Sequence, residues 1–223
     1  MYKIILCFRS IIYGGKIMKN LKKVLSVVIT AAMMSVMMLG CGGPKTTPEE
    51  STKIALDVIL KADKSQIDKI DMSKEEYNDV RNSIEESMVK QFAGTSFNLS
   101  EEEQNTLKDN VLEGISKISY EVGEANIEKD TATVTVKIKG INVTELTKQA
   151  QNKLMEKVNA DPALAQDQDK LIKESINVTG ELFKEAPLTD DSRDVEFTLT
   201  KQDNRWTVSD SSFGDLLTAL YRF

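Results

Sequence analysis

Hydrophobic and polar positions follow three successive patterns along this chain. Residues 24–39 form a largely apolar run, and from residue 48 to about residue 116 apolar positions recur every three or four residues. Beyond residue 118, two stretches alternate strictly between apolar and polar side chains. A period near 3.6 predicts amphipathic helices, whereas a period of two predicts strands with one buried face. The chain is therefore expected to have an apolar leader, then helices, then a mixture of strands and helices.

Helix starts are marked by a hydroxyl residue followed three positions later by glutamate. The three pairs are Thr47 and Glu50, Ser73 and Glu76, and Ser100 and Glu103. In this arrangement, called a capping box, each side chain accepts a hydrogen bond from the backbone N–H of the other residue. Three helices are predicted, and each carries one apolar stripe. We expect these stripes to pack into a core; a partner-binding surface is the alternative.

Two strand pairs are predicted in the second half of the chain. The first occupies residues 118–138 and turns at Glu128–Asp130, and the second occupies residues 195–208 and turns at Gln202–Arg205. Between them, a helix capped at Asn142 is expected to reach about Val158, and after a break at Asp161–Pro162 another should cover about 167–184. A short last helix is predicted to be capped by Ser212 and Asp215.

The predicted fold class is α+β. Helices are expected to pack on one face of a curved antiparallel sheet of about four strands, formed by two hairpins with a helical insertion between them.

Cys41 ends the apolar run and follows Leu39 and Gly40. Three lysines precede the run, which is long enough for a signal peptide and short for a membrane span. This arrangement resembles the lipobox of bacterial lipoproteins, although Met38 stands where leucine is usual. The resemblance implies cleavage between Gly40 and Cys41 and a diacylglyceryl group on the Cys41 thiol. The alternative is a transmembrane anchor followed by an ordinary buried cysteine.

Residues 1–17 add nothing to a leader that already begins cleanly at Met18. Gly14-Gly15-Lys16 can be encoded by a purine-rich stretch like a ribosome-binding site, so we expect these residues to be untranslated. A longer n-region is the alternative.

The expected organisation is an untranslated extension (1–17), a signal peptide (18–40), a lipidated tether (41–47) and a single α+β domain (48–223). Fully extended, the six residues from Gly42 to Thr47 reach about 20 Å at roughly 3.3 Å per residue.

Composition narrows the class of partner. The first 40 residues hold six of the 29 basic residues and none of the 35 acidic ones, so the mature chain carries 23 basic residues and a net charge of −12. An acidic domain is not expected to bind nucleic acid. Cys41 is the only cysteine of the mature chain, which excludes an internal disulfide.

The order of elements, the short tether and the closing hairpin 197–208 with its single tryptophan resemble a group of lipoproteins of Gram-positive bacteria. That resemblance covers about residues 45–223. It implies a cystatin-like or nuclear-transport-factor-2-like domain of unknown function, a conical fold that encloses a pocket, and no known activity.

Residue types that usually carry catalysis are scarce. The chain has no histidine, which removes the usual hydrolase triads and the commonest zinc ligand. No glycine-rich phosphate loop is present, and the aspartates at 167–169 and 190–191 lack the glycine and glutamate of a calcium loop. We therefore expect no catalytic residue, no metal and no cofactor. An enzyme that uses a buried carboxylate is the remaining catalytic alternative; Glu121 and Glu124 are expected to face water.

Tyr120 and Trp206 are the candidate ligand-binding residues. We interpret them as amphipathic aromatics on neighbouring inner strands, where they could line a cavity; core packing is the alternative. The leading hypothesis is a non-catalytic binding module, lipid-anchored on the outer face of the cytoplasmic membrane, that contacts an envelope protein, a cell-wall component or a small apolar ligand. The alternative is a structural or accessory subunit of a membrane complex.

Overall fold

A computed structural model describes residues 44–93 and 99–222 of the chain. The predicted leader, its cleavage site at Gly40 and the lipidation site at Cys41 lie outside the described residues. The fold combines helices with an open four-stranded antiparallel sheet, so the predicted fold class is confirmed.

The sheet is built from two hairpins, as predicted. Strands β1 (Ser119–Glu128) and β2 (Thr131–Lys139) form the first, and β4 (Arg193–Gln202) and β5 (Arg205–Val208) form the second. The hairpins join through β2 and β4, which gives the order β1-β2-β4-β5. The turn of the second hairpin is tight because Asp203 and Asn204 both adopt positive φ angles, the geometry that matches the twist of paired strands.

The two faces of the sheet differ sharply. The inner face is apolar, and its central residues Val134, Val136, Phe197 and Leu199 are fully buried. Threonines and charged residues alternate with them and form the outer face, where Thr133 pairs with Thr198 and Lys137 pairs with Asp194. Glu121 and Glu124 are exposed, as expected. Strand alternation therefore predicts correctly which side of the sheet faces the core.

Helix α3 (Pro48–Leu56) packs across the inner face and contacts β1, β2 and β5. It continues into a π-helical turn, η1 (Asp57–Lys61), and a short 3₁₀ helix, η2 (Ile67–Ile70). Beneath these lie α4 (Lys74–Ala93) and α5 (Glu101–Ser116), both of which contact η1. All three predicted capping boxes are present, with both hydrogen bonds made in each.

Helices α6 (Val143–Ala160) and α7 (Gln168–Glu185) form the predicted insertion, joined by the 3₁₀ helix η3 (Pro162–Gln166). Helix α7 packs on α5 at two glycines. A Cβ at Gly114 would overlap the carbonyl oxygen of Phe183, and one at Gly180 would lie 2.9 Å from Leu107 Cδ1. The α6–α7 hairpin thereby joins the rest of the fold through a close helix crossing.

Two details at the end of the chain differ from the sequence prediction. Helix α8 (Asp210–Leu220) begins before Ser212 and Asp215, so neither residue is its N-cap. The hydroxyl of Ser212 instead accepts a hydrogen bond from the backbone N–H of Thr198, at 2.9 Å, and so connects the helix to β4. A parallel pair of two-residue strands, β3 (Ile141–Asn142) and β6 (Tyr221–Arg222), was not predicted.

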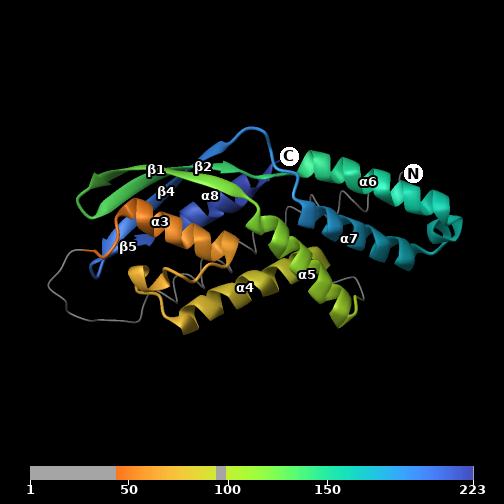
Figure 1. Ribbon diagram of the computed structural model, residues 1–223, viewed down its shortest axis with the longest axis horizontal. Coiled ribbons are helices and arrows are strands. Elements are labelled where there is room, and N and C mark those ends of the chain that lie inside the picture. Colours follow the sequence, from red (N-terminus) through yellow and green to blue (C-terminus); the bar gives the residue numbers. More distant parts are fainter. Residues whose placement is uncertain (1–43, 94–98, 223) are drawn as a thin grey trace.

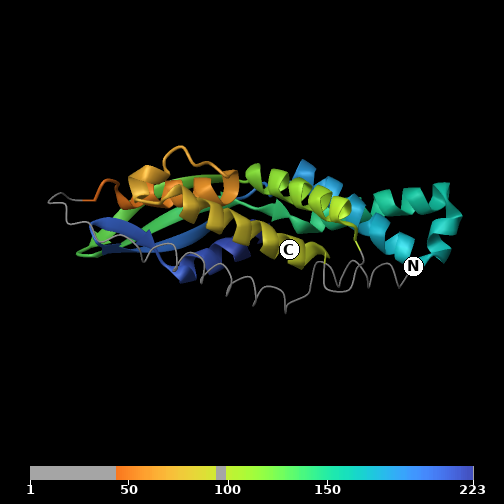
Figure 2. The same cartoon turned by 90° about the horizontal axis from the view of Figure 1, so that it is seen from below.

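The molecule is elongated. Figure 1 shows the start of α3 and the turns of both hairpins at one end of the long axis, and the turn between α6 and α7 at the other. Figure 2, turned by 90°, shows the same separation. We call these the sheet end and the arm end, and the α6–α7 hairpin is called the arm.

Candidate functional site

The sheet end contains the first described residues of the chain. The Lys45 ammonium forms an ion pair with Asp71, and the Thr46 hydroxyl lies 2.7 Å from that of Ser51. Thr46 is buried, with 5% of its surface exposed, and Thr47 caps α3. The sequence places these residues in the tether, but here they are held against the domain.

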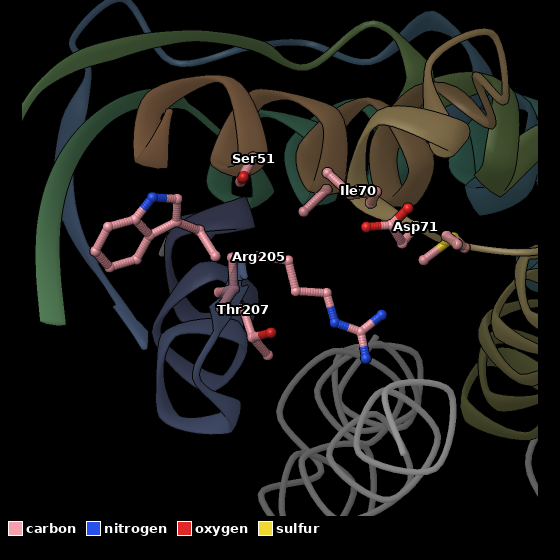
Figure 3. Close-up of a pocket in the computed structure, with 9 residues that line it drawn as sticks. Ser51, Ile70, Asp71, Arg205 and Thr207 are labelled. Carbon is pink, nitrogen blue, oxygen red and sulfur yellow. The ribbon is translucent and has the colours of Figure 1, made fainter. Parts of the chain in front are cut away.

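A small cavity lies beside this anchored segment. Figure 3 shows Ser51 of α3, Asp71 of the turn after η2, and Arg205 and Thr207 of β5 around it. Ala55, Ile70, Met72, Trp206 and Val208 complete the lining. Its volume is about 40 Å³, which is room for about three water molecules at roughly 10–15 Å³ each. Sites for drug-sized ligands are about 300–1,000 Å³.

Trp206 lines this cavity, but most of its side chain packs in the hydrophobic core. Its side chain belongs to the hydrophobic core and only 9% of its surface is exposed. Asp71 is the carboxylate among the lining residues, and it is ion-paired with Lys45 and 38% exposed. The carboxylate therefore does not stand desolvated in an apolar pocket, which is the environment that prepares an acid for catalysis.

Tyr120 lies far from Trp206 across the sheet. Both point to the inner face, but Tyr120 is on β1 and Trp206 is on β5, the two edge strands, with β2 and β4 between them. The interpretation that they occupy neighbouring inner strands is wrong, because β2 and β4 meet in the middle of the sheet. Tyr120 does not line the cavity beside Trp206.

Tyr120 instead belongs to a polar cluster at the π-helical turn. Its hydroxyl donates a hydrogen bond to Asp57 Oδ1, and the Lys53 ammonium donates to Asp57 Oδ2 at 2.5 Å. Lys61, one helical turn further along, donates to the carbonyl oxygens of Ser116 and Ile118. The cluster joins α3 and η1 to the segment that leads from α5 into β1.

The electrostatics of the cluster favour a structural role. Burial, the hydrogen bond to Asp57 and the negative charges of Asp57 and Asp63 all raise the pKa of Tyr120 above its ordinary value. Tyr120 therefore stays protonated and acts as a donor. Burial lowers the pKa of Lys61, and the charge of Asp57 offsets part of that effect. The side-chain polar atoms of Tyr120, Asp57 and Lys61 each have a hydrogen-bond partner, so the cluster fixes α3 and η1 against the start of β1.

Asp57 and Lys61 were not among the residues predicted from the sequence. One signal was available: Lys53, Asp57 and Lys61 are spaced four residues apart, which places them on one face of a helix. That spacing indicates neighbours within the helix but says nothing of Tyr120, which is 63 residues away from Asp57.

In the described part of the chain, no group of three or more His, Cys, Asp or Glu side chains is placed to hold a metal ion. Among the same residues, no helix is both long and apolar enough to cross a bilayer.

Comparison with known proteins identifies the family. The model of a domain of unknown function, DUF5105, matches residues 40–221. The chain belongs to the DUF5105 family. A search of curated proteins found no match.

One similar solved structure extends the comparison. The crystal structure of a protein described as a proposed lipoprotein (ycdA), from Bacillus subtilis subsp. subtilis str. 168, superimposes with a TM-score of 0.63 at 21% sequence identity. The match covers 80% of this chain and 57% of that one, so this chain spans little more than half of its neighbour's length. At this identity the similarity establishes a shared fold.

Proposed function

We propose that this DUF5105 protein is a lipoprotein, held by a lipid on Cys41 at the outer face of the cytoplasmic membrane. The lipobox-like sequence supports this, and the family match begins at residue 40, next to the predicted cleavage site. The structurally similar protein is itself described as a proposed lipoprotein. Two or more acyl chains hold a protein stably on a bilayer without help from a basic patch.

We propose that the domain acts by binding another macromolecule through its surface and not by catalysis. The observation that supports this is the closed centre of the sheet: Val134, Phe197 and Leu199 are fully buried beneath α3 and α8. A small apolar ligand would need space there, and the cavity near Trp206 is too small to provide it. An envelope protein or a cell-wall component is therefore favoured over a small ligand.

An accessory role in a membrane complex is the second candidate. The closed interior favours it equally, because a structural subunit also needs no ligand pocket. The two candidates differ in how long the partner stays bound: an accessory subunit should purify with its complex, whereas a binding module should release and exchange its partner.

We propose in addition that the domain is a cystatin-like or nuclear-transport-factor-2-like domain from a Gram-positive organism. A helix lying across one face of an antiparallel sheet supports the first part, and similarity to a Bacillus protein supports the second.

The anchor is tested by metabolic labelling with an alkyne fatty acid. The unaltered chain and a Gly43→Ala control should both carry label, whereas Cys41→Ala should carry none and keep its leader. Gly43 is the matched control because it lies two residues from Cys41 and has no thiol. Label retained by Cys41→Ala would refute the proposed anchor.

A further inference from the structure

The tether between Cys41 and the domain is short. Lys45 is ion-paired with Asp71, and Thr46 is buried against Ser51, so the chain is attached to the domain from Lys45 onward. Only Gly42, Gly43 and Pro44 separate that attachment from Cys41. Four residue steps span at most about 14 Å at roughly 3.3–3.6 Å each.

The attachment point lies at one extremity of an elongated molecule. Glu49, in the first turn of α3, accepts a hydrogen bond from the backbone N–H of Ala125 at 2.9 Å, so the start of α3 lies against the distal part of β1. The backbone N–H of Lys201 donates to the carbonyl of Asp130 at 2.7 Å, which brings both hairpin turns together. Figures 1 and 2 show the start of α3 and both hairpin turns at the sheet end.

The sheet end also carries an exposed apolar side chain. Ile127 is 52% exposed, and it lies on β1 just before the turn that joins β1 to β2. It is two residues from Ala125, whose N–H is held by α3, so it lies near the attachment of the tether. An isoleucine exposed in water gains free energy if it meets the apolar boundary of a bilayer.

We propose that the sheet end is the membrane-facing surface, that Ile127 contacts the lipid interface, and that the arm points away from the bilayer. This rests on the proposed lipid at Cys41. Glu128 and Asp130 flank Lys129 and give the turn a net charge of −1, so Ile127 supplies the apolar contact and the turn itself has no attraction to anionic headgroups. Charge disfavours a flat orientation, since a chain of net charge −12 is repelled by anionic lipid within a screening length of about 8 Å.

The arm then extends into the envelope space. Its two helices have 18 residues each, which corresponds to about 27 Å at 1.5 Å per residue. An upright domain holds this hairpin far from the headgroups, where a partner attached to the cell wall can reach it.

Site-specific fluorescence quenching tests the orientation. Cysteines placed at Ile127 (I127C) or Gln202 (Q202C) report on the sheet end, and one at Ala165 (A165C) reports on the arm end; all three residues are exposed. Cys41 carries the lipid, so the added thiol is the one labelled. The full lipidated chain is reconstituted in phosphatidylglycerol–phosphatidylethanolamine vesicles that contain a headgroup nitroxide lipid.

The proposal predicts quenching several-fold stronger at residues 127 and 202 than at 165. Inserting a long glycine–serine segment after Gly43 should reduce that difference, because the domain is then free to rotate. Equal quenching at all three positions, or stronger quenching at 165, would overturn the orientation. The mass of the same preparations reports acylation of Cys41 separately: an unlipidated protein overturns the anchor, whereas a lipidated protein with equal quenching overturns the orientation alone.

Discussion

Replacing Phe197 by alanine tests whether the centre of the sheet is filled. Phe197 is fully buried on β4, and its ring meets that of Phe213 on α8 edge to face, with centroids 6.5 Å apart and planes at 89°. Truncating a buried phenylalanine costs about 3–5 kcal/mol, through lost transfer free energy and the cavity left behind. About 0.5–1.5 kcal/mol of that comes from the lost aromatic pair.

We therefore expect Phe197→Ala to lower the free energy of unfolding by about 4 kcal/mol. For a domain of this size, that corresponds to a melting temperature about 8–16 °C lower. The assay is urea unfolding of the leaderless mature chain, followed by circular dichroism. Thr198→Ala is the matched control, because the adjacent side chain points to the exposed outer face, and it should change stability by about 1 kcal/mol or less.

A cost for Phe197→Ala no larger than that of Thr198→Ala would refute the reasoning. It would mean that the space beside Phe197 is already open, and an internal ligand would again be the favoured hypothesis.

Three further predictions concern helix packing, the polar cluster and a capping box. Gly114→Ala should lower the free energy of unfolding by about 2 kcal/mol, because overlap with the α7 backbone outweighs the gain in helix propensity. A variant that is more stable in urea unfolding would contradict the close packing of α5 on α7. Tyr120→Phe should lower the free energy of unfolding by about 1–2 kcal/mol, because it removes the donor to Asp57. In the unaltered chain, the absorbance of Tyr120 should titrate above its ordinary pKa of 10.0. Titration at or below that value would count against the cluster. Hydrogen bonds from the backbone and side chain of Ser100 lower the pKa of Glu103 below its ordinary 4.5, so its stabilisation is present above that pH and is lost as the pH falls through the lowered pKa. Melting temperatures from about pH 6 to pH 3 should fall less steeply for Glu103→Gln, and an unchanged slope would exclude this contribution.

Local signals in the sequence predict most of the elements correctly. The capping boxes at Thr47, Ser73 and Ser100 mark their helices because each satisfies backbone donors within three residues. Period-two alternation likewise identifies the buried face of β2 and β4. Both signals depend on neighbours in the sequence, so they can be interpreted without knowing the rest of the fold.

The errors concern arrangements between distant segments. Alternation places Tyr120 and Trp206 on the same face but does not determine that β2 pairs with β4, and this pairing separates the two aromatics to opposite edges. Ser212 has the residue type of a helix cap, yet its hydroxyl bonds to the backbone of β4, 14 residues earlier. The contact of Gly114 with α7 also depends on tertiary packing; an isolated glycine within a helical pattern is its only local signal.

The most direct test of the account is native mass spectrometry of the protein extracted from membranes of its own organism in mild detergent. We predict a single species with the mass of residues 41–223 plus the acyl groups on Cys41, and no bound small molecule. An unacylated precursor mass would contradict the anchor, and a stoichiometric small ligand that survives detergent extraction would contradict a domain that binds through its surface.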